Sequence, residues 1–145
     1  MARVEHSVVI DRPVEDVWSF MADPENDSQW VSGVVESAKT SEGPMGLGAT
    51  LKIVRNFLGR RIEADLELTE WEPNKRSAIR STSGPISVAG TRTFEAVEGG
   101  TRVTDEVEAD LRGFFRLAEP LVERTAQRQI ESDYESLKGI LESQT

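Results

Sequence analysis

The residues of this chain best suited to chemistry are an arginine and an aspartate that strand pairing is predicted to place side by side. If the turn at residues 98–99 joins two antiparallel strands, Arg92 lies directly opposite Asp105. A buried arginine can orient a carboxylate or an enolate, and an aspartate can transfer protons. The same pair can equally be a cross-strand ion pair that fixes the register of the sheet. The sequence leaves both interpretations open.

His6 is the only histidine of the chain. It shares the inner face of a predicted strand with Val4, Val8 and Ile10. Histidine can act as a general base near neutral pH, or it can be a hydrogen-bonded residue of the core or of an edge strand. Arg92, Asp105 and His6 are therefore the candidate catalytic residues. A multi-histidine metal site is impossible and the chain has no cysteine, so we expect no metal.

A second group of residues is predicted to line an internal cavity. An inner surface that is apolar, with a few charged groups, is typical of ligand pockets. The predicted cavity residues are Trp30, Ile53, Arg55, Phe57, Ile79, Arg92, Phe94, Asp105, Phe114 and Gln129.

Three of these positions have alternative interpretations. Trp30 either packs under a short helix or lines one end of the pocket. Arg55 either lines the cavity or is a rim residue whose charged head reaches solvent. Phe114 and Phe115 either gate the cavity mouth, or one is in the core and the other is exposed; an exposed apolar patch there would favour a protein-interaction role.

The periodicity of apolar residues predicts the elements that position these side chains. Alternation predicts a strand over 4–10, and helical spacing from 14 to 21 predicts a helix with Asp11 near its N-cap and Pro13 in its first turn. Asp23-Pro24 ends that helix, and a second short turn follows at 28–31. After Gly113 an apolar stripe predicts a long helix, in which Pro120 either starts the main part or kinks it.

Between these helical segments the apolar period is two. The candidate strands are 34–40, 50–57, 61–71, 76–83, 87–97 and 101–111. Two-residue turns at 58–59 and 73–74 imply antiparallel neighbours. In this pattern Trp71 falls on the outer face, where we expect it to stack near Arg76.

Composition narrows the class of protein. The chain has 145 residues, which suits a single domain over 1–145. Its net charge is −9 and its pI about 4.7, which disfavours binding to nucleic acid and to anionic membranes. We find no signal peptide and no apolar segment that could span a bilayer, and the absence of cysteine fits a reducing compartment. A cytoplasmic location is therefore expected.

Four short motifs carry a resemblance to a known family. They are Ile10-Asp-Arg-Pro-Val-Glu-Asp-Val-Trp18, Asp23-Pro24-Glu25 with Trp30, Gly100-Thr-Arg-Val-Thr104 and Leu137-Lys-Gly-Ile-Leu-Glu142. With the order of elements, they resemble the START-like (SRPBCC, Bet v 1-like) superfamily, in its polyketide cyclase/dehydrase and lipid-transport branch. The resemblance implies an α+β helix-grip fold: a bent seven-stranded antiparallel sheet around a long C-terminal helix, with two short helices between strands 1 and 2.

The resemblance also implies three functions. The first is binding or transport of an apolar or aromatic small molecule, lipid- or polyketide-like, in an internal cavity. The second is a cofactor-free polyketide cyclase/dehydratase of the aromatase type, which would use Arg92, Asp105 and His6. The third is a protein-interaction module of the same fold. We expect an apolar ligand as partner, no cofactor, no nucleic acid, no stable membrane insertion, and a monomer or weak homodimer.

Overall fold

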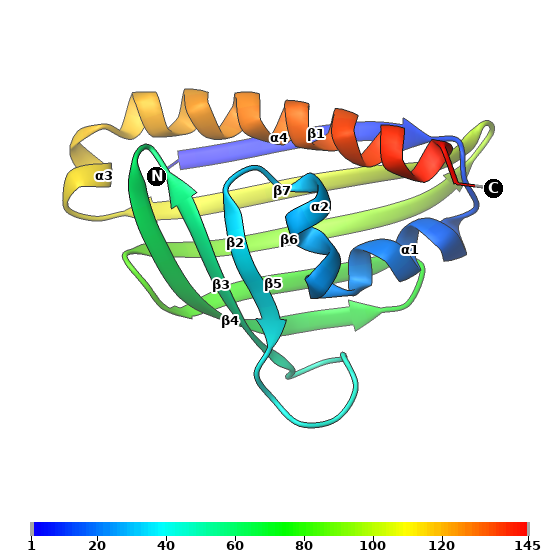
Figure 1. The fold of residues 1–145 in the computed structure, drawn as a ribbon, viewed down its shortest axis with the longest axis horizontal. Helices are drawn as coiled ribbons and strands as arrows, with labels where there is room; N and C mark the ends of the chain where they lie inside the picture. The colour runs from blue at the N-terminus through cyan, green and yellow to red at the C-terminus, as the bar shows by residue number, and fades with distance from the viewer. Residues whose placement is uncertain (1, 145) are drawn as a thin grey trace.

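Seven antiparallel strands form one curled sheet, and a long helix lies across its concave side (Figure 1). The computed structural model describes residues 2–144, without the side chain of Phe114. In chain order the elements are β1 (Ala2–Ile10), α1 (Val14–Ala22), the 3-10 turn η1 (Pro24–Asn26), α2 (Asp27–Trp30), β2 (Val34–Lys39), β3 (Thr50–Phe57), β4 (Arg60–Glu72), β5 (Arg76–Ser83), β6 (Ile86–Val97), β7 (Gly100–Leu111), α3 (Phe114–Leu117) and α4 (Glu119–Glu142).

The strand order is β1-β7-β6-β5-β4-β3-β2, so β1 and β2 form the two edges. This is the predicted helix-grip arrangement, with its long C-terminal helix and its short helices between the first two strands. The predicted register is confirmed where β6 meets β7, because Arg92 pairs with Asp105 and Phe94 with Val103. Pro120 lies in the first turn of α4, so it starts this helix.

The turn between β4 and β5 differs from the prediction. It contains three residues, 73–75, and Glu72 pairs with Arg76. A two-residue turn would have shifted this register by one. A bulge farther along β4 compensates for the difference, so that Leu68 still pairs with Ile79 as predicted.

The same bulge reverses the predicted facing of Trp71. It lies between Leu68 and Glu70, and the extra residue turns the rest of β4 over by one position. Trp71 therefore packs inward, with its ring centroid 4.9 Å from that of Trp18. Arg76 forms an ion pair with Glu70 instead of stacking on the tryptophan. The prediction for Trp71 was wrong because it continued the alternation of residues 62–68 to the end of the strand, although the apolar positions shift by one between Leu68 and Trp71.

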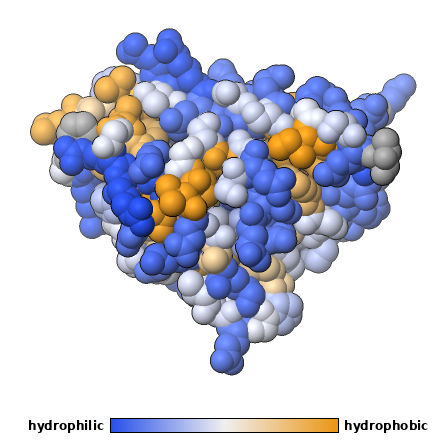
Figure 2. All heavy atoms as spheres, viewed as in Figure 1, coloured by the Kyte–Doolittle hydropathy of each residue, from blue (hydrophilic) through white to orange (hydrophobic). Residues whose placement is uncertain are grey.

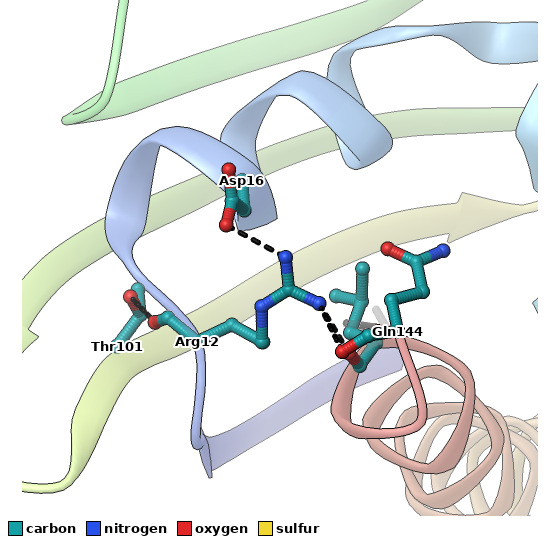
Figure 3. A network of polar contacts seen from close by, with 5 residues as sticks. Arg12, Asp16, Thr101 and Gln144 are labelled. Carbon is teal, nitrogen blue, oxygen red and sulfur yellow. Dashed lines mark hydrogen bonds and ion pairs between the residues drawn. The ribbon is translucent and has the colours of Figure 1, made fainter.

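A clamp around Arg12 joins the start of the chain to its end (Figure 3). The Arg12 guanidinium donates to the carbonyl oxygens of Leu141 (2.8 Å) and Gln144 (3.0 Å), and to the Asp16 carboxylate (2.7 Å). A cation at the C-terminal end of a helix satisfies carbonyl groups that have no partner within the helix. Asp11, predicted near the N-cap of α1, does not cap it, because Pro13 occupies that position without a side-chain bond.

Side chains of α4 also bond to the main chain of β1 along its outer edge. These are the bonds of Glu123 with the Arg3 N–H (2.9 Å), of Gln127 with the N–H (3.4 Å) and carbonyl (3.0 Å) of Glu5, and of Lys138 with the carbonyl of Val9 (2.8 Å). Directly after the strand, Glu142 accepts a bond from the Asp11 N–H (2.8 Å). The contacts hold α4 beside β1 over most of the length of the strand.

The core consists of two clusters at opposite ends of the molecule. The large cluster contains Ile10, Val17, Trp18, Met21, Trp30, Phe94, Val103, Tyr134, Leu137 and Leu141. The small cluster contains Ala2, Phe57, Ile62, Leu111, Phe115 and Val122. The large cluster lies near α1 and the end of α4, and the small one lies near α3 (Figure 1). Among residues 2–144, no helix is both long enough and apolar enough to cross a membrane.

Candidate ligand-binding cavity

A cavity of about 390 Å³ lies between the concave face of the sheet and the helices. Its walls come from α1, α2, α4 and all seven strands, although the edge strands β1 and β2 contribute only Val4 and Val34. Most of the lining side chains are apolar. The predicted residues in this lining are Trp30, Ile53, Arg55, Phe57, Ile79, Arg92, Phe94, Asp105 and Gln129. The side chain of Phe114, the tenth predicted residue, lies outside the described structure, and contact of any of these residues with a ligand stays a prediction.

Arg92 and Asp105 are held together at one wall of the cavity. Arg92 Nε lies 3.2 Å from Asp105 Oδ1 and 3.3 Å from Oδ2, and Nη2 lies 3.2 Å from Oδ2. Tyr134, on α4, donates its O–H to the same Oδ2. The Asp105 side chain is 9% exposed and that of Arg92 is 27% exposed. Since Arg92 lines the cavity, its accessible part faces the space in which a ligand would lie.

This environment fixes the protonation states of Arg92 and Tyr134. Burial acts to lower the pKa of Arg92, but the nearby Asp105 and Tyr134 outweigh it and raise that pKa above its ordinary value. Burial raises the pKa of Tyr134 well above its ordinary value, although the charge of Arg92 opposes this. At neutral pH the wall therefore presents a guanidinium cation and a neutral phenol.

Trp30 packs against this polar group from α2. The Arg92 Cζ atom lies 5.5 Å from the centroid of the Trp30 ring, a cation–π contact. The Trp30 and Tyr134 rings meet edge to face at 5.2 Å. Trp30 lines the cavity and also packs in the large cluster, so its two predicted roles are compatible. Its indole Nε1 is buried and has no hydrogen-bond partner among the described residues.

His6 is near this group but does not line the cavity. It pairs with Asp105 across β1 and β7, as the sheet register requires. Its ring centroid lies 5.6 Å from that of Tyr134. The lining of the cavity includes Tyr134 and Asp105 but not His6. The predicted role of His6 as a general base therefore lacks a contact with the cavity.

A second network of polar contacts lies in the cavity wall around Arg55. Its Nη2 donates to the carbonyl oxygen of Ser32 and to Gln129 Oε1, both at 3.2 Å. Ser32 in turn donates its N–H to Asp133 Oδ1 at 3.1 Å. Burial lowers the pKa of Arg55, and the charge of Asp133 opposes the shift. The Arg55 head thus binds the loop after α2 and α4, and Asp133, which interrupts the apolar stripe of α4, has a structural role there.

Tyr134 and Asp27 are among the cavity residues that sequence reasoning missed. Tyr134 lies on the inward side of the long helix α4, which was predicted only as an apolar stripe. Asp27 was not considered, yet it lines the cavity and accepts a hydrogen bond from Ser37 Oγ at 2.8 Å. Burial raises the pKa of Asp27, and the bond from Ser37 and the charge of Arg92 oppose the shift. Within residues 2–144, no group of three or more acidic or histidine side chains gathers as a metal site would require.

Nearly the whole chain matches one known protein family. The family model described as polyketide cyclase / dehydrase and lipid transport matches residues 1–142. The chain belongs to this family. Its relatives in Mycobacterium tuberculosis and Mycobacterium bovis are uncharacterised proteins, 32% identical over 108 residues that make up 72% of this chain. The chain spans 63% of the length of these relatives.

Solved structures of other proteins share the fold. A protein from Thermus thermophilus has a TM-score of 0.83 at 23% identity, covering 96% of both chains. The Zhui aromatase/cyclase from Streptomyces sp. R1128 has a TM-score of 0.77 at 16% identity, covering 97% of this chain and 93% of its own. Ara h 8.0201 has a TM-score of 0.74 at 14% identity, covering 98% of both chains. At such identities these similarities concern the fold and do not assign a reaction.

Proposed function

We propose that this protein binds or transports an apolar or aromatic small molecule, lipid- or polyketide-like, inside its cavity. The observation that supports this most directly is the cavity itself. Its volume of about 390 Å³ lies in the range of small-molecule sites, and side chains do not fill it. Ile53, Ile79 and Phe94 are among the apolar side chains that would surround the body of the ligand.

The wall at Arg92 gives the proposed ligand an orientation. Asp105 engages only one side of the guanidinium, and the accessible part of Arg92 faces the cavity. A cation held in a largely apolar space favours a ligand with one oxygen acceptor, such as a carbonyl, a phenolate or a carboxylate. The proposed ligand is therefore apolar over most of its surface and has one such group, directed at Arg92.

The test uses N-phenyl-1-naphthylamine, an apolar aromatic probe that becomes fluorescent in apolar sites. We expect saturable binding to the purified protein. Gly90 lines the cavity, and a Cβ there would meet its neighbours, among them Val107 and Ile79, only at ordinary contact distances. Gly90→Leu should therefore fill the cavity and weaken binding at least about tenfold, the effect of losing a few methylene contacts. Gly139→Leu adds the same side chain on the exposed face of α4 and is the matched control.

Equal probe binding by Gly90→Leu and the unaltered protein would contradict the proposal. A second test is native mass spectrometry of the protein purified from cell extract, which identifies the natural ligand by its mass. The expected result is a small molecule that is bound to the unaltered protein and to Gly139→Leu but is absent from Gly90→Leu.

A cofactor-free cyclase/dehydratase is a second candidate function. It is favoured by the convergence of Arg92, Asp105 and Tyr134 at the cavity wall, where a cation could stabilise an enolate and a phenol could donate a proton. A solved neighbour is an aromatase/cyclase by its name. Against proton abstraction by Asp105, its oxygens already accept bonds from Arg92 and Tyr134. This arrangement is better suited to anchoring a ligand than to removing a proton.

Turnover separates the two candidates. A synthetic poly-β-carbonyl thioester is incubated with the protein, and cyclised, dehydrated product is sought by mass spectrometry. Tyr134→Phe removes only the phenol oxygen. If this variant binds the probe normally but loses product formation, the protein is an enzyme. If the unaltered protein forms no product above the uncatalysed rate, the binding function stands alone.

The third predicted function, a protein-interaction module, depended on an exposed apolar patch at Phe114 and Phe115. Phe115 is 5% exposed and belongs to the small cluster. The patch is therefore not formed by Phe115, and the side chain of Phe114 lies outside the described structure.

A further inference from the structure

The most exposed large apolar residues near α3 lie on its outer side and on the first turns of α4. Leu117 is 90% exposed and Leu121 is 48% exposed. Figure 2 shows apolar atoms on the surface at the end of the molecule where α3 lies, beside strongly polar ones. Neighbouring leucines exposed to this extent place apolar area in contact with water, which is typical of an interaction surface.

The segment from 112 to 128 is basic in an acidic chain. It holds four exposed arginines, Arg112, Arg116, Arg124 and Arg128, against the acidic residues Glu119 and Glu123. The whole chain, in contrast, has a net charge of −9. Within α4, positions 121, 124 and 128 follow one another at intervals of three or four residues, so Leu121, Arg124 and Arg128 share one outward face. Arg116 and Leu117 are exposed on α3, directly before it. We call the exposed surface of this segment, made of Leu117, Leu121 and the four arginines, the basic leucine face.

The basic leucine face lies over one end of the cavity. Phe57 lines the cavity, and its ring centroid lies 6.1 Å from that of Phe115 in α3. Leu117 follows Phe115 in the same single helical turn, and its side chain is directed to solvent. The inner side of α3 therefore covers the cavity end, while the outer side carries the exposed leucine.

We propose that the basic leucine face docks on an anionic phospholipid surface. The leucines would enter the boundary between headgroups and acyl chains, and the arginines would bind lipid phosphates. A second copy of the chain fits less well, because a two-fold contact through this face would bring the same arginines together. The acidic remainder of the molecule would point away from the lipid. Docking by itself is independent of the cavity; a role in exchanging an apolar ligand with the bilayer rests on the proposed function.

The experiment is cosedimentation of the full chain with vesicles. We expect binding to vesicles of phosphatidylcholine with phosphatidylglycerol, weak or no binding to pure phosphatidylcholine, and release by salt. The double variant Arg116→Glu/Arg124→Glu should weaken binding at least about tenfold, since each basic residue near an anionic surface contributes about fivefold and the variant removes two. Leu117→Ser/Leu121→Ser should weaken binding without changing its salt dependence. The matched control is Arg80→Glu/Arg102→Glu, which makes the same change of charge at exposed ion pairs of the sheet.

Three results would overturn the inference. One is failure of the unaltered protein to bind the anionic vesicles. Another is an equal loss of binding in the control and in the Arg116/Arg124 variant, which would assign the effect to net charge alone. The third is a dimer in solution that Leu117→Ser/Leu121→Ser dissociates, which would assign the face to a second copy. Binding of N-phenyl-1-naphthylamine, measured without vesicles, separates these failures from a failure of the proposed function.

Discussion

The two ends of the cavity are built from the same sheet and the same helix, yet they differ in strength. The large cluster gathers residues from α1, α2, two inner strands, β1 and the second half of α4, and several of them are fully buried. The small cluster is closed by α3, which is a single turn. We therefore call the end at the large cluster the anchored end, because many packed residues hold it. The end at the small cluster is the covered end, because the single turn of α3 closes it.

Polar groups follow this division. Trp30 and Tyr134 belong to the large cluster, and both contact Arg92. The oxygen of a ligand bound at Arg92 would therefore lie beside the anchored end. The apolar remainder of the ligand would extend toward Phe57 and the cover formed by α3. The predictions that follow are ordered by expected effect, and each can refute or refine this contrast between the anchored and the covered end.

The largest contrast is expected between glycines at the two ends. Gly100 has a φ of 134°, and a Cβ there would overlap the carbonyl oxygen of Ile10. Gly113 has a φ of 58° but open space around it. Gly100→Ala should lower the free energy of unfolding by more than about 4 kcal/mol, because backbone must move. Gly113→Ala should cost about 1–2 kcal/mol, the strain of the left-handed conformation alone. Urea unfolding followed by tryptophan fluorescence measures both, and equal costs would refute the contrast.

The second prediction concerns the polar wall at the anchored end. Asp105→Ala leaves Arg92 and Tyr134 without their partner and should cost about 3–5 kcal/mol. Replacing both members, as in Arg92→Leu/Asp105→Leu, should recover most of this loss. Glu95, which pairs with Arg102 on the exposed face, provides the control, and Glu95→Ala should cost less than about 1 kcal/mol. A double variant as unstable as Asp105→Ala would show that the aspartate stabilises the fold by other means.

The third prediction compares equal truncations in the two clusters. Leu137 is 0% exposed in the large cluster, and Leu111 is 4% exposed in the small one. Leu137→Ala should cost about 4 kcal/mol and Leu111→Ala about 2 kcal/mol, because a thin cover can collapse on the space left behind. Thermal and urea unfolding give both values. A larger cost at Leu111 would make the covered end the stronger of the two.

The smallest effect is expected at Asp27 and depends on pH. Its folded pKa is raised by burial, so the folded state holds this proton more tightly than the unfolded state does. The stability from this group is present below its ordinary pKa and is lost as pH rises through the raised one. Asp27→Asn, which keeps an acceptor for Ser37, should therefore stabilise the protein at pH 7 relative to its effect at low pH. Urea unfolding across the acidic range tests this, and a variant equally destabilised at every pH would contradict it.

Much of the fold follows from the sequence because local rules decide it. Period-two alternation and turn lengths set the pairing of Arg92 with Asp105, and proline positions set the starts and ends of helices. Trp71 was placed on the wrong face, because the alternation of residues 62–68 was continued across the bulge, where the apolar positions shift by one. The alternation rule describes one strand at a time, whereas a bulge depends on how two strands pair.

The cavity was harder to predict in its polar details. The strand residues were identified because the inner face follows from alternation. Tyr134 was not identified as the partner of Asp105, because the rotation of α4 relative to the sheet is set by packing over a long sequence separation. One signal was available: Asp133 and Tyr134 place two polar groups on an inward stripe, and buried polar groups need partners. That signal indicates a polar contact but does not name the residue on the other side.

The bonds between α4 and β1 have a consequence for behaviour in a crowded solution. β1 is an edge of the sheet, and an unprotected edge offers free N–H and carbonyl groups that can recruit strands from other molecules. Glu123, Gln127 and Lys138 occupy such groups along β1 with side chains of α4. The helix that closes the cavity thus also guards one border of the sheet against the strand addition that begins aggregation.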